Sequence, residues 1–112
     1  MAYCPDANDI IRIDFDPQVG REQAERRPAL VLSPRLYNEK ARLCLLCPIT
    51  NQAKGYPFEV ALPDGHLVTG VVLADQIKSF SWEGRRAEFI CVAPSGLADQ
   101  VRAMIKALIQ LG

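Results

Sequence analysis

The sequence has no long apolar run, no excess of charge of one sign, and only one histidine. No apolar run approaches the ~20 residues of a membrane-spanning helix, so such a helix is excluded. Thirteen basic residues balance thirteen acidic ones. Net charge therefore gives no general attraction to nucleic acid or anionic lipid, and any polyanion site must be local. The remaining composition, 49% hydrophobic and 23% charged in 112 residues, predicts one globular domain over residues 1–112.

The inventory of reactive side chains excludes several mechanisms. His66 is the only histidine, so two histidines cannot act as acid and base within one chain, and its polar turn favours a solvated side chain. Neither GxxxxGK followed by Ser or Thr nor GxGxxG occurs, which leaves nucleotide-driven chemistry without support. Asp14 and Asp16 come nearest to the paired carboxylates of a two-metal nuclease, but no further carboxylate in the sequence obviously joins them to form such a site. We expect no metal and no cofactor.

The four cysteines are predicted to be reduced core residues. Residues 1–9 show neither a basic nor an apolar segment of the secretory kind, so we expect the protein not to be exported. Cys44 and Cys47 form a CxxC within an apolar strand, where residues three apart point to opposite faces. A metal site would need Cys4 or His66 nearby, because no second CxxC completes the usual ligand set. Burial in the core is the favoured interpretation for these thiols.

Alternating apolar and polar residues predict a series of short strands. In residues 9–15, Ile11, Ile13 and Phe15 fall on one face and Arg12 and Asp14 on the other. Residues 16–27 then read as a long mobile loop, and loops of this length usually bind or catalyse something. Further strands are predicted at residues 29–32, 42–49, 58–62, 68–79 and 88–92.

Two helical segments complete the prediction. A short turn is expected at residues 34–40, opened by Pro34 with Ser33 as a possible N-cap. The one strong helix, at residues 97–111, carries an apolar stripe that should close a barrel or meet a second subunit. Its stripe consists of Leu97, Val101, Met104, Ile105, Leu108 and Ile109. Short antiparallel strands ending in one amphipathic helix predict a mainly β fold, a strongly bent sheet or small barrel.

Phosphate-binding side chains concentrate in two places, the loop at residues 21–27 and the polar turn at residues 50–54. Taken alone, such a charged loop is most simply a solvated surface. Three motifs change that weighting: DFDPxxGxEQxxxRPALVLSPxxYN at residues 14–38, KGYPFEV at 54–60 and LADQIKS at 73–79. Together they resemble the MazF/PemK family of toxin-antitoxin ribonucleases over nearly the whole chain.

The resemblance implies a fold and an activity. Members of this family have an SH3-like barrel of the PemK/CcdB type with a C-terminal helix, form homodimers in the cytoplasm, and cleave single-stranded RNA at short specific sequences. Growth arrest follows from loss of mRNA. The RNA sequence recognised here does not follow from the motifs, and an ACA-like triplet is only a guess. The partner implied is a MazE-like antitoxin with an acidic flexible tail that competes with RNA.

The resemblance places the catalytic residues at Arg27, Thr50 and Glu22. Attack of the ribose 2′-hydroxyl on phosphorus leaves a 2′,3′-cyclic phosphate and a 5′-hydroxyl and needs no metal. A guanidinium and a hydroxyl suit the developing charge on the phosphoryl oxygens. Glu22 is the better base because arginine stays protonated, although the family's arginine is sometimes given an acid-base part.

Other residues are expected to hold the RNA. The family places substrate-binding positions along a dimer groove, here Gln23, Arg26, Lys54, Gln76 and Lys78. Bases also need aromatic surfaces to stack on. Tyr56, Phe15 and Trp82 are candidates, although each is more readily a core residue.

Two rival functions use the same fold. A non-enzymatic gyrase poison resembling CcdB would need a tryptophan at the extreme C-terminus, whereas this chain ends LIQLG and has its only tryptophan at Trp82. An inactive SH3-like binding module would not need Glu22, Arg27 and Thr50. The ribonuclease is the favoured interpretation, and fold alone cannot separate it from the others.

Overall fold

The computed structural model describes residues 3–15 and 25–110. The strands it contains are β1 (Asp9–Asp14), β2 (Arg26–Val31), β3 (Cys44–Thr50), β4 (Glu59–Ala61), β5 (Val71–Leu73), β6 (Lys78–Phe80) and β7 (Glu88–Val92). The helices are α1 (Arg35–Ala41), the short 3-10 helix η1 (Ala74–Gln76) and α2 (Leu97–Ile109). The predicted mainly β class with a C-terminal helix is confirmed.

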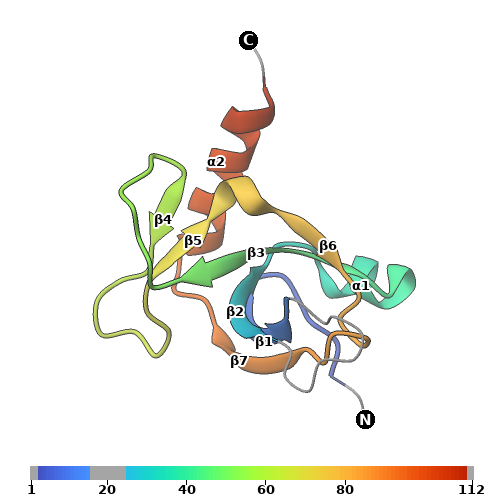
Figure 1. Ribbon diagram of the computed structural model, residues 1–112. Helices are drawn as coiled ribbons and strands as arrows, with labels where there is room; N and C mark the ends of the chain where they lie inside the picture. Colours follow the sequence, from blue (N-terminus) through green and yellow to red (C-terminus); the bar gives the residue numbers. More distant parts are fainter. Residues whose placement is uncertain (1–2, 16–24, 111–112) are drawn as a thin grey trace.

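The strands form a sharply curved antiparallel sheet (Figure 1). Their order is β4-β5-β3-β2-β1-β7, and β6 pairs with β3 outside this path. The first residues of β3 pair with β6, and its last residues pair with β5. One strand thus belongs to two halves of the sheet, which bends the layer around a core as the sequence predicts.

The core consists of two clusters on opposite sides of the sheet. One includes Ile10, Cys47 and Val101 of α2. The other includes Ile11, Cys44 and further residues near β6. The register between β1 and β7 shifts between Ile10 and Ile11, and both faces of β1 are covered, so consecutive isoleucines are fully buried. The placement of the CxxC pair on opposite faces, both buried, is confirmed.

Helix α2 uses only the first part of its apolar stripe against the sheet. Leu97 and Val101 are buried in the first cluster, and Met104 packs against it. Leu108 and Ile109 are 43% and 75% exposed. The first part of the stripe therefore covers one side of the core, and its last residues extend beyond the core. The predicted helix ends at residue 111, which lies outside the described part of the chain.

Three local predictions are corrected. Ser33 does not cap α1: the N-cap is Pro34, without a side-chain bond. The Ser33 hydroxyl instead donates to Asn38 Oδ1 at 2.6 Å and accepts the Leu45 N–H at 2.8 Å. The run at residues 68–79 is not one strand, because η1 separates β5 from β6.

The third correction concerns the predicted loop at residues 16–27. Arg26 and Arg27 are the first residues of β2, paired with Asp14 and Ile13 of β1. Residues 16–24 lie outside the described part. Within the described ranges, no helix is long and apolar enough to cross a membrane.

Candidate functional site

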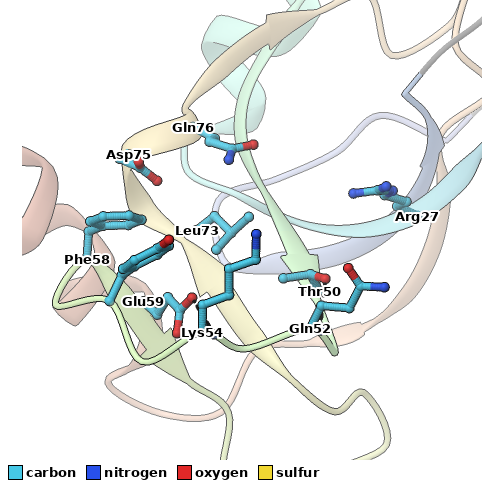
Figure 2. A pocket seen from close by; sticks show the side chains of 10 residues that line it. Arg27, Thr50, Gln52, Lys54, Phe58, Glu59, Leu73, Asp75 and Gln76 are labelled. Carbon is cyan, nitrogen blue, oxygen red and sulfur yellow. Dashed lines mark hydrogen bonds between the residues drawn. The ribbon is translucent and has the colours of Figure 1, made fainter.

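The pairing of β2 with β3 sets the centre of the site. Ala29 lies opposite Pro48. Arg27 lies two residues before Ala29 on β2 and Thr50 two residues after Pro48 on β3, so both lie just beyond the last paired residues, on one face. Both side chains line the same cavity (Figure 2). Where the pairing of β2 with β3 ends, the fold thus brings together two residues that are 23 positions apart in the sequence.

The cavity is open and has a volume of about 380 Å³. Its walls come from β2, the end of β3, the segment before β4 with the first residue of β4, and β5 with η1. Figure 2 shows the charged ends of Arg27 and Lys54 directed toward the same space. The lining residues are Arg27, Thr50, Gln52, Lys54, Tyr56, Phe58, Glu59, Leu73, Asp75 and Gln76. Two cations, two hydroxyls and two amides offer hydrogen-bond donors suited to a phosphodiester.

Arg27 is held from one side by a neighbouring carboxylate. Its Nε donates to Glu25 Oε1 at 2.6 Å, and the same oxygen forms an ion pair with a terminal nitrogen of the guanidinium. The two side chains are 43% and 52% exposed. Glu25 does not line the cavity. Among the described residues, the other terminal nitrogen of the guanidinium has no hydrogen-bond partner, so donors remain for an anion that enters the cavity.

Thr50 is fixed by its strand and by the segment opposite it. Its Oγ1 accepts the Gln52 N–H at 3.1 Å, and no described residue accepts the hydroxyl hydrogen, so that hydrogen is available to a substrate oxygen. Thr50 pairs with Val71 of β5. Gly70, which precedes Val71, has φ +115° and its backbone lies against the Thr50 carbonyl. A Cβ on Gly70 would lie 2.8 Å from the carbonyl carbon of Thr50 and closer still to the carbonyl oxygen. This approach requires glycine.

The three aromatic residues considered for base stacking differ in their exposure and in their position relative to the cavity. Tyr56 is 50% exposed, lines the cavity, and stacks on Phe58 with ring centroids 5.2 Å apart. Phe15 packs edge-on against Phe80. Trp82 is 3% exposed within the second core cluster. Of the three, Tyr56 alone combines exposure with a place at the cavity.

Four of the predicted site residues are brought together: Arg27, Thr50, Lys54 and Gln76 all line the cavity. Lys78 is exposed on β6 but does not line it. Glu22 and Gln23 lie outside the described residues.

Arg26 is placed elsewhere. Its guanidinium donates to Asp14 Oδ1 at 2.7 Å, to Glu88 Oε1 at 2.9 Å and to the Arg86 carbonyl at 3.0 Å. Asp14 is 4% exposed and also binds Arg86. Hydrogen bonds from Arg86 first, then from Arg26, lower the pKa of Asp14. Arg26 thus ties β1, β2 and β7 together on the face of the strand opposite to Arg27.

Sequence reasoning missed two carboxylates of the cavity. Glu59 lies within KGYPFEV and Asp75 within LADQIKS, so position inside a motif was the available signal. Neither is predicted as a site residue, because acidic groups do not suggest a phosphate site. The sequence places Glu25 among the charges of the predicted loop, and its contact with Arg27 follows only from the start of β2 at Arg26.

A curved, mainly β domain whose open cavity presents guanidinium, ammonium and hydroxyl donors beside an exposed aromatic ring has the features of proteins that bind a phosphodiester chain. A family model described as PemK-like, MazF-like toxin of type II toxin-antitoxin system matches residues 6–109. The chain belongs to this family.

Individual relatives agree with that assignment. The chain is 52% identical over 108 residues to the endoribonuclease toxin MazF of Escherichia coli strain K12, covering 96% of each. A crystal structure of MazF from Deinococcus radiodurans superposes with a TM-score of 0.87 at 49% identity, covering 96% of this chain and 98% of that one. A MazE-MazF structure from the same organism gives 0.88 at 46% identity, covering 98% and 100%.

Proposed function

We propose that the chain is a sequence-specific, metal-independent endoribonuclease toxin that cleaves single-stranded RNA. The observation that carries this function is the meeting of Arg27 and Thr50 in one open cavity with Lys54 and Gln76. A relative 52% identical over nearly the full length is named an endoribonuclease toxin. The consequence in a cell is loss of mRNA, arrested translation and arrested growth.

The reaction uses the RNA itself as the nucleophile. The ribose 2′-oxygen bonds to the adjacent phosphorus as its proton passes to a base, the bond from phosphorus to O5′ breaks, and O5′ takes a proton. The products are a 2′,3′-cyclic phosphate and a 5′-hydroxyl. Arg27 and Thr50 donate to the phosphoryl oxygens as negative charge develops there, and a preorganised donor of this kind is worth ~10² to 10³ in rate.

The base in this scheme is Glu22. Arginine keeps its proton in proteins and cannot readily accept another, which favours a carboxylate for this role. Glu22 precedes Arg27 by five positions.

Substrate is held by the remaining polar groups of the cavity and by Tyr56. Lys54 and Gln76 contact phosphates or base edges, Tyr56 stacks a base, and Gln23 and Lys78 extend the contact along the strand of RNA. Stacking contributes about 1 to 3 kcal/mol per base. Arg26 is left out of this set, because its donors are engaged by Asp14 and Glu88.

The proposed partners are a second copy of the chain and an antitoxin. Solved relatives include MazE-MazF complexes, and a MazE-like antitoxin with an acidic flexible tail would compete with RNA for Arg27 and Lys54. We place the protein in the cytoplasm, where mRNA and such an antitoxin are found. The gyrase-poison alternative is not favoured, because the only tryptophan is buried in the core.

The test is cleavage of a long single-stranded RNA in EDTA by the wild type, by Arg27→Ala and by a matched control, Arg12→Ala. Arg12 is exposed on β1 and does not line the cavity. We expect cuts at one short motif with cyclic-phosphate and 5′-hydroxyl ends from the wild type and the control, and at least a ~100-fold loss in Arg27→Ala. No cutting by folded, antitoxin-free wild type refutes the function.

A further inference from the structure

One carboxylate of the cavity is engaged by the backbone. Glu59, the first residue of β4, lines the cavity. Its Oε2 accepts the N–H of Lys54, and its Oε1 accepts the N–H of Gly55, both at 3.0 Å. Hydrogen bonds to an ionised carboxylate are about twice as strong as neutral ones. This side chain therefore fastens the segment just before it in the sequence.

The turn is closed by further contacts. The Glu59 N–H donates to the Tyr56 carbonyl at 3.1 Å. Gly55 adopts φ +79°, which lets the chain reverse there. Tyr56 stacks on Phe58. Residues 54–59 thus fold around one carboxylate and present the Lys54 side chain to the cavity (Figure 2).

We propose that Glu59 is a positioning residue for the RNA substrate. It fixes the backbone from which Lys54 and Tyr56 reach the cavity, and it takes no part in bond cleavage. Arg27 and Thr50 are held independently of this turn, Arg27 by the pairing of β2 with β1 and Thr50 by the pairing of β3 with β5. Loss of the turn therefore weakens substrate binding and leaves the chemical step in place. The proposal rests on the ribonuclease function given above.

The direction in which Glu59→Gln changes RNA affinity distinguishes a positioning role from a simple charge effect. It removes one negative charge from the cavity, which by electrostatics alone would strengthen the binding of an anionic RNA. The amide can accept only one of the two N–H groups, and its own NH₂ faces the other. If Glu59 positions the turn, binding weakens in spite of the lost charge. A simple charge effect and a positioning effect thus have opposite directions.

The experiment measures KM and kcat on a short fluorescent single-stranded RNA that spans one cut site mapped with the wild type, in EDTA. Affinity is measured separately on the same RNA with 2′-deoxyribose at the cut site. The variants are Glu59→Gln, Glu59→Asp, Lys54→Ala and the double variant Glu59→Gln/Lys54→Ala. Glu39→Gln, an exposed carboxylate on α1, is the matched control, and thermal unfolding verifies the fold of each.

We expect Glu59→Gln and Glu59→Asp to raise KM and the dissociation constant about tenfold, the order of one or two charged hydrogen bonds, with kcat within about twofold. In the double variant the two effects should not add, because Glu59 acts through the Lys54 backbone. Unchanged or tighter binding in Glu59→Gln, a fall confined to kcat, or full additivity overturns the proposal. Absence of cleavage by the wild type would instead refute the ribonuclease function.

Discussion

Gly70 approaches the backbone of Thr50 more closely than any residue with a side chain could, so Gly70→Ala tests whether this contact positions the site. The added Cβ would lie 2.8 Å from the Thr50 carbonyl carbon and 3.0 Å from Asn51 Oδ1. Ordinary contact begins at 3.4 Å, and the Thr50 carbonyl oxygen is closer than the carbon, so the end of β3 and the Gly70 segment must separate by more than 0.6 Å, the difference between 3.4 and 2.8 Å. The φ of +115° adds strain.

These terms set the expected size of the effect. Backbone strain at such a φ costs about 1–3 kcal/mol, and forced overlap in a packed region costs about 1–3 kcal/mol more. A domain whose unfolding free energy lies near the middle of the usual range of ~5–15 kcal/mol stays folded under that load. A misplacement of about 1 Å can lower a rate ~100-fold. We therefore expect Gly70→Ala to lose about 2–6 kcal/mol of stability and about 10- to 100-fold in single-turnover cleavage.

Gly65→Ala is the matched control. Gly65 also has positive φ, +79°, but a Cβ there meets nothing within 4 Å. It should show the backbone cost alone, ~1–2 kcal/mol, with cleavage unchanged. Urea unfolding gives the free energies, and single-turnover cleavage of the mapped RNA gives the rates. Equal results for the two alanine variants in both assays would refute the role of the Gly70 contact.

Hydrogen bonds from Arg86 lower the pKa of Asp14, so Asp14 stabilises the fold above its unfolded pKa of ~3.9 and loses that contribution as pH falls through the lower folded value. Asp14→Asn should flatten the acid limb of urea-unfolding free energy against pH, and an unchanged limb would contradict this. Glu25→Gln should raise cleavage about threefold at low salt, because a carboxylate that competes with phosphate is neutralised, and the gain should vanish as salt screens it; a loss of rate would argue that Glu25 instead orients the cavity arginine. Burial raises the pKa of the Cys44 and Cys47 thiols to about 12, so mass spectrometry should find them alkylated at about pH 8 only after unfolding, and rapid native labelling would contradict their burial.

The parts of the fold that sequence predicts are those with strong periodicity. Strand β1 and helix α2 were found from alternation and from an apolar stripe, because burial on one face imposes a fixed spacing. The break at η1 was not found, since the residues from Val71 to Phe80 keep an apolar character on both sides of it. That break turns Gln76 and Asp75 toward the cavity.

The sequence predicts some residues of the site and not others. Motifs identify which residue types are present, whereas strand pairing, which the motifs do not reveal, decides which side chains meet. The polar turn after an apolar strand marks Thr50 and Lys54 as phosphate-binding candidates, and the family resemblance assigns them to the site. Glu59 is not predicted, since a carboxylate in a phosphate site contradicts charge complementarity until its backbone partners are seen. The sequence does not show whether a charged side chain is bound by other groups of the folded protein or is available to a ligand.

Arg26 and Arg27 make the same point for two neighbouring residues of one type. Composition assigns both to a basic loop, and both could then contact RNA. Once β2 begins at Arg26, consecutive side chains must point to opposite faces of the sheet. Arg26 then meets Asp14 across the pairing with β1, and Arg27 points into the cavity. The choice between an ion pair that joins three strands and a donor for phosphate is therefore made by where the strand starts. Extending the predicted strand back from residue 29 to residue 26 would have separated the two arginines from sequence alone.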